Sequence, residues 1–412
     1  MDNLTHTLTG LLIADMAVSG SAWRTKAAPR QWFRDATFAT SVLAHNLPDL
    51  DFVYTNITGG KLGYLLHHRG HTHTFLLALP QALLCYGLVV LVLRLARRRP
   101  SPLEHGIMLT VACLGPLFHL LMDYGNNYGI HPFWPFDNRW YYGDLVFIIE
   151  PWLLIGLVCA TYAALRTRIA KGLLVAALVG LLGLAWVMPL IHPVVALALT
   201  VFAGVSLWKL ARAGPLLRIG FGVVVVGALV GALLTGRREA LALVREELAV
   251  EPLVATRSLA ATPTPGNPLC WSILAVQHAG PTYRIRQAVV APWPGLWSME
   301  SCRWPATETT APLLPATSPA LPHNAERVQW QAEFRAPLAE LQELYANDCT
   351  ARALLRFTRA PFWMQQGDQT LVGDLRYDRE PEIGFTEMVL EPEAECPRNV
   401  PTWVPPLLDW MQ

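Results

Sequence analysis

Long apolar runs fill residues 1–236 of this 412-residue chain and then stop. Hydrophobic residues make up 53% of the sequence and charged residues only 15%, whereas a soluble globular chain carries about 25% charged residues. The pattern therefore predicts a polytopic α-helical membrane protein over 1–236, followed by an appended domain. The formal net charge of +1 supplies no field for steering onto nucleic acid, so we exclude that class of partner.

We expect about eight membrane spans. Three runs are long enough to cross a bilayer alone, and five shorter or weaker stretches complete the set. In chain order the eight ranges are 4–23, 36–44, 74–96, 107–122, 145–165, 173–191, 194–208 and 216–235.

The basic loops predict the orientation, because short loops rich in lysine and arginine tend to stay cytoplasmic. With eight spans, the basic connections 24–34, 94–99, 166–171 and 209–218 all fall on one side of the membrane. Both termini then lie on the other side. We therefore expect the C-terminal domain to be extracytoplasmic.

The C-terminal part has a different composition and predicts a mostly β, sandwich-like domain. We expect a linker over 237–268, which includes the Pro/Thr stretch TPTPGNP, and a domain over 269–412. Partly alternating runs predict strands at 283–291, 326–334 and 354–363, and 337–348 predicts a helix.

Four cysteines lie in this domain, at Cys270, Cys302, Cys349 and Cys396. In an oxidising compartment they are compatible with two disulfides, and the sequence leaves all three pairings open. Four free thiols are the alternative.

Histidines and carboxylates gather in four short segments of the helical part. Nine of the twelve histidines lie within residues 1–131. Under the predicted topology all four segments reach the same membrane face. They are THTLTG (5–10), HNLPDLD (45–51), HHRGHTHT (67–74) and HLLMDYGNNYG (119–129).

Two of these segments place carboxylates where a cation could use them. His119 and Asp123 are four residues apart and so project from one face of a helix, although a helix-capping pair is the alternative. Pro48 favours a turn, which leaves Asp49 and Asp51 two apart on an extended or looped segment. A solvated acidic loop is the alternative there.

The HHRGHTHT segment crowds four imidazoles around an arginine. Metal coordination explains such crowding, because ligand histidines are neutral. Interfacial histidines without a metal are the alternative. We expect His68 and His73 to be ligands. Arg69 can clamp a phosphate or carboxylate oxygen, and a lipid headgroup anchor explains it almost equally well. His6 is a candidate ligand only because its helix is predicted to begin on the same membrane face.

These motifs, in the order MDNLTHTLTG, LPDLD, HRGHTHT and HLLMDYG, resemble the YdjM-like bacterial inner-membrane proteins, which are described as membrane-bound metal-dependent hydrolases. The resemblance covers about the first 150 residues and implies location in the inner (plasma) membrane. A more distant similarity to zinc-dependent phospholipase C rests on the segment with His119. The metal ligands that the YdjM resemblance implies are His6, Asp49, Asp51, His68, His73, His119 and Asp123.

A divalent metal here, zinc or manganese, would suit a hydrolase. Zinc with an open coordination position lowers the pKa of its water to about 7 and so supplies hydroxide at neutral pH. We expect an aspartate that is not a ligand, Asp51 or Asp123, to act as general base and Arg69 to stabilise charge. A site at headgroup depth favours a phosphoester or acyl bond in a lipid or lipid-linked substrate.

Two other classes remain open. A metal or solute transporter would use the same side chains for transit, although transporters place polar groups near the midplane. A non-catalytic envelope protein would keep the metal as a structural brace and bind a protein partner through its C-terminal domain. The tryptophans Trp293, Trp297 and Trp304 would suit such a surface.

Overall fold

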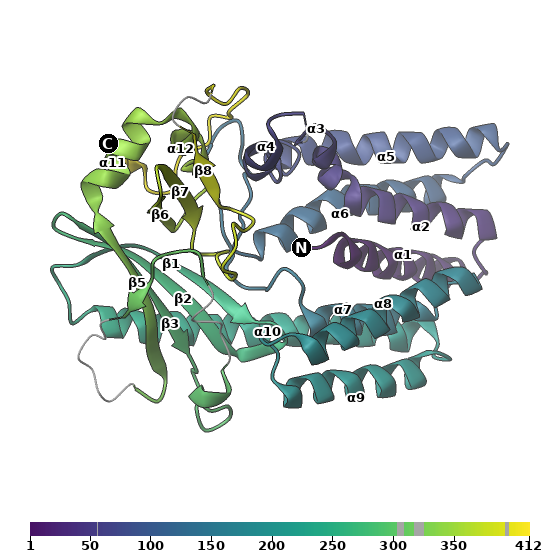
Figure 1. The fold of residues 1–412 in the computed structure, drawn as a ribbon. Helices are drawn as coiled ribbons and strands as arrows, with labels where there is room; N and C mark the ends of the chain where they lie inside the picture. The colour runs from purple at the N-terminus through teal and green to yellow at the C-terminus, as the bar shows by residue number, and fades with distance from the viewer. Residues whose placement is uncertain (56, 303–308, 317–324, 392–394) are drawn as a thin grey trace. The chain divides into compact units, whose positions relative to one another are not determined.

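The computed structural model describes all residues except 56, 303–308, 317–324 and 392–394, and it divides into two compact units (Figure 1). The first unit comprises Met1–Leu50, His71–Trp134 and Ile148–Ala232. The second unit comprises Asp51–Gly70, Pro135–Phe147 and Leu233–Gln412. Helices form the first unit and sheets dominate the second, which confirms the predicted fold class.

The first unit is a helix bundle in which α2 contacts α1, α5 and α6, while α7 contacts α1, α8 and α9. The last helix, α10, continues past this unit into the second one. The helices are α1 (Asn3–Thr25), α2 (Gln31–Asn46), α5 (Phe75–Leu95), α6 (Pro102–Tyr124), α7 (Pro151–Tyr162), α8 (Arg168–Val187), α9 (Pro193–Leu210) and α10 (Pro215–Leu248).

Each of the eight predicted span ranges overlaps one of these helices. Among the described residues five helices, α5, α6, α8, α9 and α10, are long and apolar enough to cross a membrane. The total of eight spans stays a prediction. The range 145–165 proved too long, because α7 begins only at Pro151, where the Glu150 side chain accepts a hydrogen bond from the Trp152 N–H.

Two glycines allow the helices that carry the histidines to approach closely. A Cβ at Gly115 of α6 would lie 2.4 Å from the Cβ of Ala44 in α2. A Cβ at Gly10 of α1 would lie 3.2 Å from the His45 ring, and the Ser41 hydroxyl donates to the Gly10 carbonyl at 2.8 Å. Any larger side chain at Gly115 would push α6 away from α2. It would therefore also displace His119, which lies about one helical turn after Gly115 on α6.

The second unit is built on two antiparallel sheets. The larger sheet has the strand order β1-β2-β3-β5-β4 and the smaller one β6-β7-β8. The strands are β1 (Ala255–Thr264), β2 (Asn267–Ala279), β3 (Thr282–Val290), β4 (Leu314–Pro315), β5 (Val328–Pro337), β6 (Pro361–Gln366), β7 (Gln369–Asp374) and β8 (Met388–Leu390).

Short helices complete this unit. Two come from the N-terminal half of the chain, and three follow strand β5. They are α3 (Phe52–Thr55), α4 (Gly60–His67), α11 (Leu338–Asn347), α12 (Cys349–Leu354) and α13 (Leu408–Met411). The predicted helix 337–348 corresponds to α11.

The stretch expected as a linker, 237–268, contains the end of α10, strand β1 and the β1–β2 turn. The prolines of this stretch were the reason for predicting a linker. Pro263 lies in β1, an edge strand of the larger sheet, where the lack of an N–H donor is tolerated. The strand predicted at 354–363 begins only at Pro361, because α12 occupies residues up to Leu354.

Both disulfides form, and the structure chooses one of the three pairings. Cys270 pairs with Cys302, and Cys349 pairs with Cys396. The first bridge ties β2 to the segment after η2 (Met299–Ser301), and the second ties α12 to the segment that follows β8. Trp304 lies outside the described residues.

Candidate metal centre

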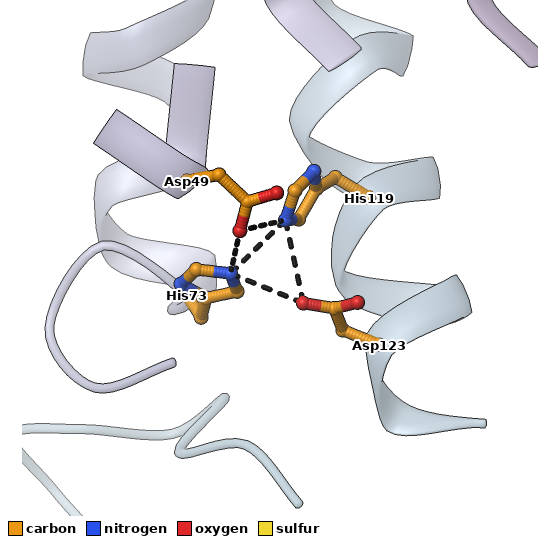
Figure 2. A group of neighbouring side chains, drawn as sticks. All are labelled: Asp49, His73, His119 and Asp123. Atoms are coloured by element: carbon orange, nitrogen blue, oxygen red, sulfur yellow. Dashed lines mark hydrogen bonds and ion pairs between the residues drawn. The ribbon is translucent and has the colours of Figure 1, made fainter. Parts of the chain in front are cut away.

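Four side chains from three parts of the first unit meet at one point (Figure 2). Asp49 comes from η1 (Leu47–Asp51), His73 from the segment before α5, and His119 and Asp123 from the last part of α6. Asp49 is 5% exposed and the other three are fully buried. A buried group of two imidazoles and two carboxylates could hold a metal ion.

Local structure explains how each residue arrives there. His119 and Asp123 are neighbours on one face of α6, as their spacing predicted. His73 directly precedes Thr74, whose side chain caps α5 by accepting from the Leu77 N–H at 3.1 Å. Asp49 lies in a 3-10 helix, where the sequence predicted an extended or looped segment.

The facing atoms of these residues have the spacing of a tetrahedral site. The His73 and His119 Nε2 atoms are 3.0 Å apart. Asp49 Oδ1 lies 3.4 Å from each of them, and Asp123 Oδ2 lies 3.1 Å from His73 and 3.4 Å from His119. Nitrogen and oxygen ligands at about 2.0–2.1 Å from zinc are about 3.3–3.4 Å from one another in a tetrahedron. Of the five separations, the three at 3.4 Å match the edges of such a tetrahedron, and the two at 3.0 and 3.1 Å are slightly shorter.

Hydrogen bonds orient the ligand side chains. His119 Nδ1 lies 2.6 Å from the His45 carbonyl oxygen, so Nδ1 carries the proton and donates it. The Nε2 lone pair of His119 is then free to face the centre, which is the usual arrangement of a metal-binding histidine. His73 Nδ1 lies 3.0 Å from the Thr72 hydroxyl, and the Asn3 amide donates to Asp49 Oδ2 at 2.8 Å.

Asp49 remains charged in this buried position. Burial alone would raise the pKa of its carboxyl, but the hydrogen bonds with His119 and His73 hold that pKa below its usual range. A charged carboxylate beside two imidazoles is the state that a cation requires of its ligands.

His6 lies next to the four residues. Its ring stacks on the His119 ring with centroids 3.8 Å apart, and its Nε2 is 3.3 Å from Asp123 Oδ1. The same carboxylate contacts the α-amino group of Met1. Asp123 thus presents Oδ2 to the tetrahedral group and Oδ1 to His6, so one carboxylate can serve two neighbouring positions.

Three other predicted residues belong to the second unit, where they contact one another. His68 Nδ1 lies 3.0 Å from Asp51 Oδ1, and the Arg69 backbone N–H donates to Asp51 Oδ2 at 3.0 Å. All three residues are buried, and Arg69 has a left-handed backbone with φ 61°. The roles predicted for Asp51, His68 and Arg69 stay predictions.

The sequence did not predict the residues that orient these candidate ligands. Asn3, Thr72 and the His45 carbonyl act through hydrogen bonds to Asp49, His73 and His119. Asn3 and Thr72 lie inside the motifs MDNLTHTLTG and HRGHTHT, next to the predicted ligands. This proximity is the feature of the sequence that could have identified them.

Comparison with known proteins supports the family resemblance. Residues 1–193 match the family model described as YdjM inner membrane protein, a range that includes all seven predicted ligands. No curated protein and no solved structure gave a match. The similarity to zinc-dependent phospholipase C is not shown by these comparisons. Over residues 1–193, slightly less than half of its length, the chain is therefore similar to the YdjM inner membrane protein family.

Proposed function

We propose that this YdjM-like region is a membrane-embedded, metal-dependent hydrolase that cleaves a phosphoester or acyl bond of a lipid or lipid-linked substrate. The observation that carries the proposal is the group Asp49, His73, His119 and Asp123, whose atoms have the spacing of a tetrahedral metal site. Mixed imidazole and carboxylate ligands suit zinc best, and manganese is the next choice.

The chain's own residues would hold the cation and manage protons around it. Asp49, His73, His119 and Asp123 are its ligands, and Asn3 keeps the Asp49 carboxylate turned toward it. A bound divalent cation supplies Lewis-acid activation of water and of the scissile bond. His6 Nε2, 3.3 Å from Asp123 Oδ1, is placed to accept or return a proton beside that carboxylate.

The position of the ligands along α6 supports a lipid substrate. His119 and Asp123 lie within the last six residues of α6, an apolar helix long enough to span the membrane. A site at the end of a span lies near headgroup depth, where phosphoester and acyl bonds of lipids are found.

We also propose that the C-terminal domain and both termini are extracytoplasmic. The basic loops predicted from the sequence support this orientation. The two disulfides, Cys270–Cys302 and Cys349–Cys396, add support because disulfides persist in oxidising compartments.

A structural metal is the second candidate, and one observation favours it. Four protein ligands that are all buried resemble a closed structural site, whereas catalytic zinc keeps one position open. His6 favours catalysis, because it places an imidazole beside Asp123 that is not one of the four ligands and can transfer a proton.

Metal content and hydrolysis, measured on the same detergent-purified full chain, test the proposal. We expect one or two equivalents of zinc or manganese in the wild type, and loss of metal and of activity toward phosphatidic acid or a carboxylic ester lipid in His119→Ala and Asp123→Asn. The matched control is His105→Ala, which removes a histidine from the same helix that contacts Tyr86 instead.

Each outcome has one meaning. Metal-free wild type that stays empty after incubation with zinc or manganese contradicts the site itself. Metal-loaded wild type that cleaves neither class of lipid bond contradicts the hydrolase and leaves the structural metal. Variants that lose metal yet keep wild-type activity contradict the assigned ligands.

A further inference from the structure

The second unit contains a cavity of about 620 Å³ that involves none of the candidate metal ligands. The end of α10, the start of β1 and the segment that connects them form most of its wall, and Tyr142, Asp144 and Arg359 complete it. Its charged lining residues are Arg237, Arg245, Arg257, Arg359, Asp144 and Glu251.

Both carboxylates of the lining are already neutralised. Arg359 holds Asp144 through two hydrogen bonds of 2.9 and 2.8 Å. Glu251 binds Arg284 at 3.1 Å and Arg286 at 2.5 Å. Neither of these last two arginines lines the cavity, so the negative charge of Glu251 is compensated from outside it.

The positive charge of the lining is not compensated to the same degree. Arg257 pairs with Asp409 at 2.8 Å. Arg237 and Arg245, eight residues apart on α10, form no ion pair with any residue that the structure describes. The cavity therefore has an excess of two guanidinium groups. Such groups bind phosphate and carboxylate oxygens in a planar, two-pronged geometry.

Three lining residues also have polar atoms that lack a partner. Tyr142 Oη, Ser258 Oγ and Arg237 Nε are buried and have no hydrogen-bond partner among the described residues. Burial raises the pKa of Tyr142, so its hydroxyl stays protonated. All three groups can donate, and a ligand rich in acceptor oxygens would satisfy them.

The position of Arg237 on α10 favours a lipid as the source of those oxygens. The apolar part of this helix ends at Thr235, and Arg237 and Arg245 follow two and ten residues later. At about 1.5 Å per residue, these positions lie about 3 and 15 Å past the apolar part. The headgroup region begins where the hydrocarbon core ends, which places Arg237 at its level.

We propose that this cavity binds the phosphate group of an anionic ligand, and that a membrane phospholipid headgroup supplies it. The inference stands apart from the proposed hydrolase, because it depends on residues of the second unit only.

The test is a titration of the full chain in neutral detergent, followed by native mass spectrometry. The probes are phosphatidylglycerol, zwitterionic phosphatidylcholine, and soluble glycerol phosphate. We expect phosphatidylglycerol to bind the wild type in preference to phosphatidylcholine. In the double variant Arg237→Gln/Arg245→Gln its affinity should fall at least about tenfold, because two charge-assisted contacts are lost.

Two further variants make the result specific. Arg238→Gln removes the exposed neighbouring charge of α10, which does not line the cavity, and should leave binding within about twofold. Ala249→Phe keeps every charge but fills part of the cavity, and should weaken binding. This variant decides the question if the double variant fails to fold.

The possible results separate the sources. If phosphatidylglycerol binds and glycerol phosphate does not, the result supports a lipid headgroup as the source of the phosphate. Equal binding of glycerol phosphate at these arginines keeps the phosphate site but overturns the lipid as its source. No binding of either probe, or equal loss in Arg238→Gln and the double variant, overturns the site.

Discussion

The candidate metal centre and the arginine-held pairs elsewhere in the chain neutralise buried carboxylates in different ways. In the second unit Asp374 is held by the Arg376 guanidinium at 2.8 Å, and Asp144 by Arg359. The helix bundle uses the same device between Asp15 and Arg218, at 2.8 and 2.9 Å. Asp49, also in the helical unit, instead meets two histidine nitrogens and the Asn3 amide. This difference supports the proposal that the carboxylate of Asp49 is a ligand of a cation.

The two units also differ in what ties distant segments together. Two disulfides do so in the second unit. In the first unit the His/Asp group joins η1, the start of α5 and the end of α6. If the proposal is right, metal and oxidation state should stabilise different parts of the molecule.

Breaking the Asp15–Arg218 pair should give the largest loss of stability. Arg218→Gln leaves a buried carboxylate unpaired in the helix bundle, and we expect a loss of about 3–5 kcal/mol. Unfolding in detergent measures it. The control is Arg30→Gln, which breaks a half-exposed pair with Glu104 and should cost about 1 kcal/mol or less. A small loss for Arg218→Gln would show that water reaches Asp15.

Metal should protect the helical unit alone. Zinc at about 1,000 times its Kd should stabilise the site-bearing helices by about 4 kcal/mol, because it binds only the folded form. Hydrogen exchange measured peptide by peptide should show slower exchange in α6 and at the start of α5, with β2 and β3 unchanged. Uniform protection of both units would contradict the comparison.

The local parts of this arrangement were predictable from the sequence, and the long-range parts were not. The spacing of His119 and Asp123 places them on one helix face, and a threonine capping the next apolar run places His73. The Asp15–Arg218 pair joins residues 203 apart, and no local pattern selects such a partner. The disulfide pairing was open for the same reason. Pro263 was misread because an edge strand tolerates proline, and edge position depends on the whole sheet.

Removing a disulfide should affect the second unit and leave the metal centre intact. Cys349→Ser removes the disulfide to Cys396, which links two residues 47 apart in the sequence. We expect the free energy of unfolding to fall by about 2–4 kcal/mol. Zinc content should not change. The control is Cys113→Ser, which removes a free thiol from α6. Loss of zinc in Cys349→Ser but not in Cys113→Ser would mean that the two units do not stabilise independently.

The smallest predicted effect tests how the centre is held. Asn3→Ala removes the amide that donates to Asp49 Oδ2 but leaves all four ligands in place. Partners that orient a ligand typically contribute about tenfold or more to metal affinity, so we expect zinc to bind about tenfold more weakly, at full stoichiometry. Competition with a chelator measures the affinity. Asn46→Ala is the matched control, because Asn46 bonds Thr7 and the Val42 carbonyl instead. Unchanged affinity in Asn3→Ala would mean that Asp49 is oriented by the cation alone, and the contrast with the arginine-held carboxylates of the second unit would then be sharper still.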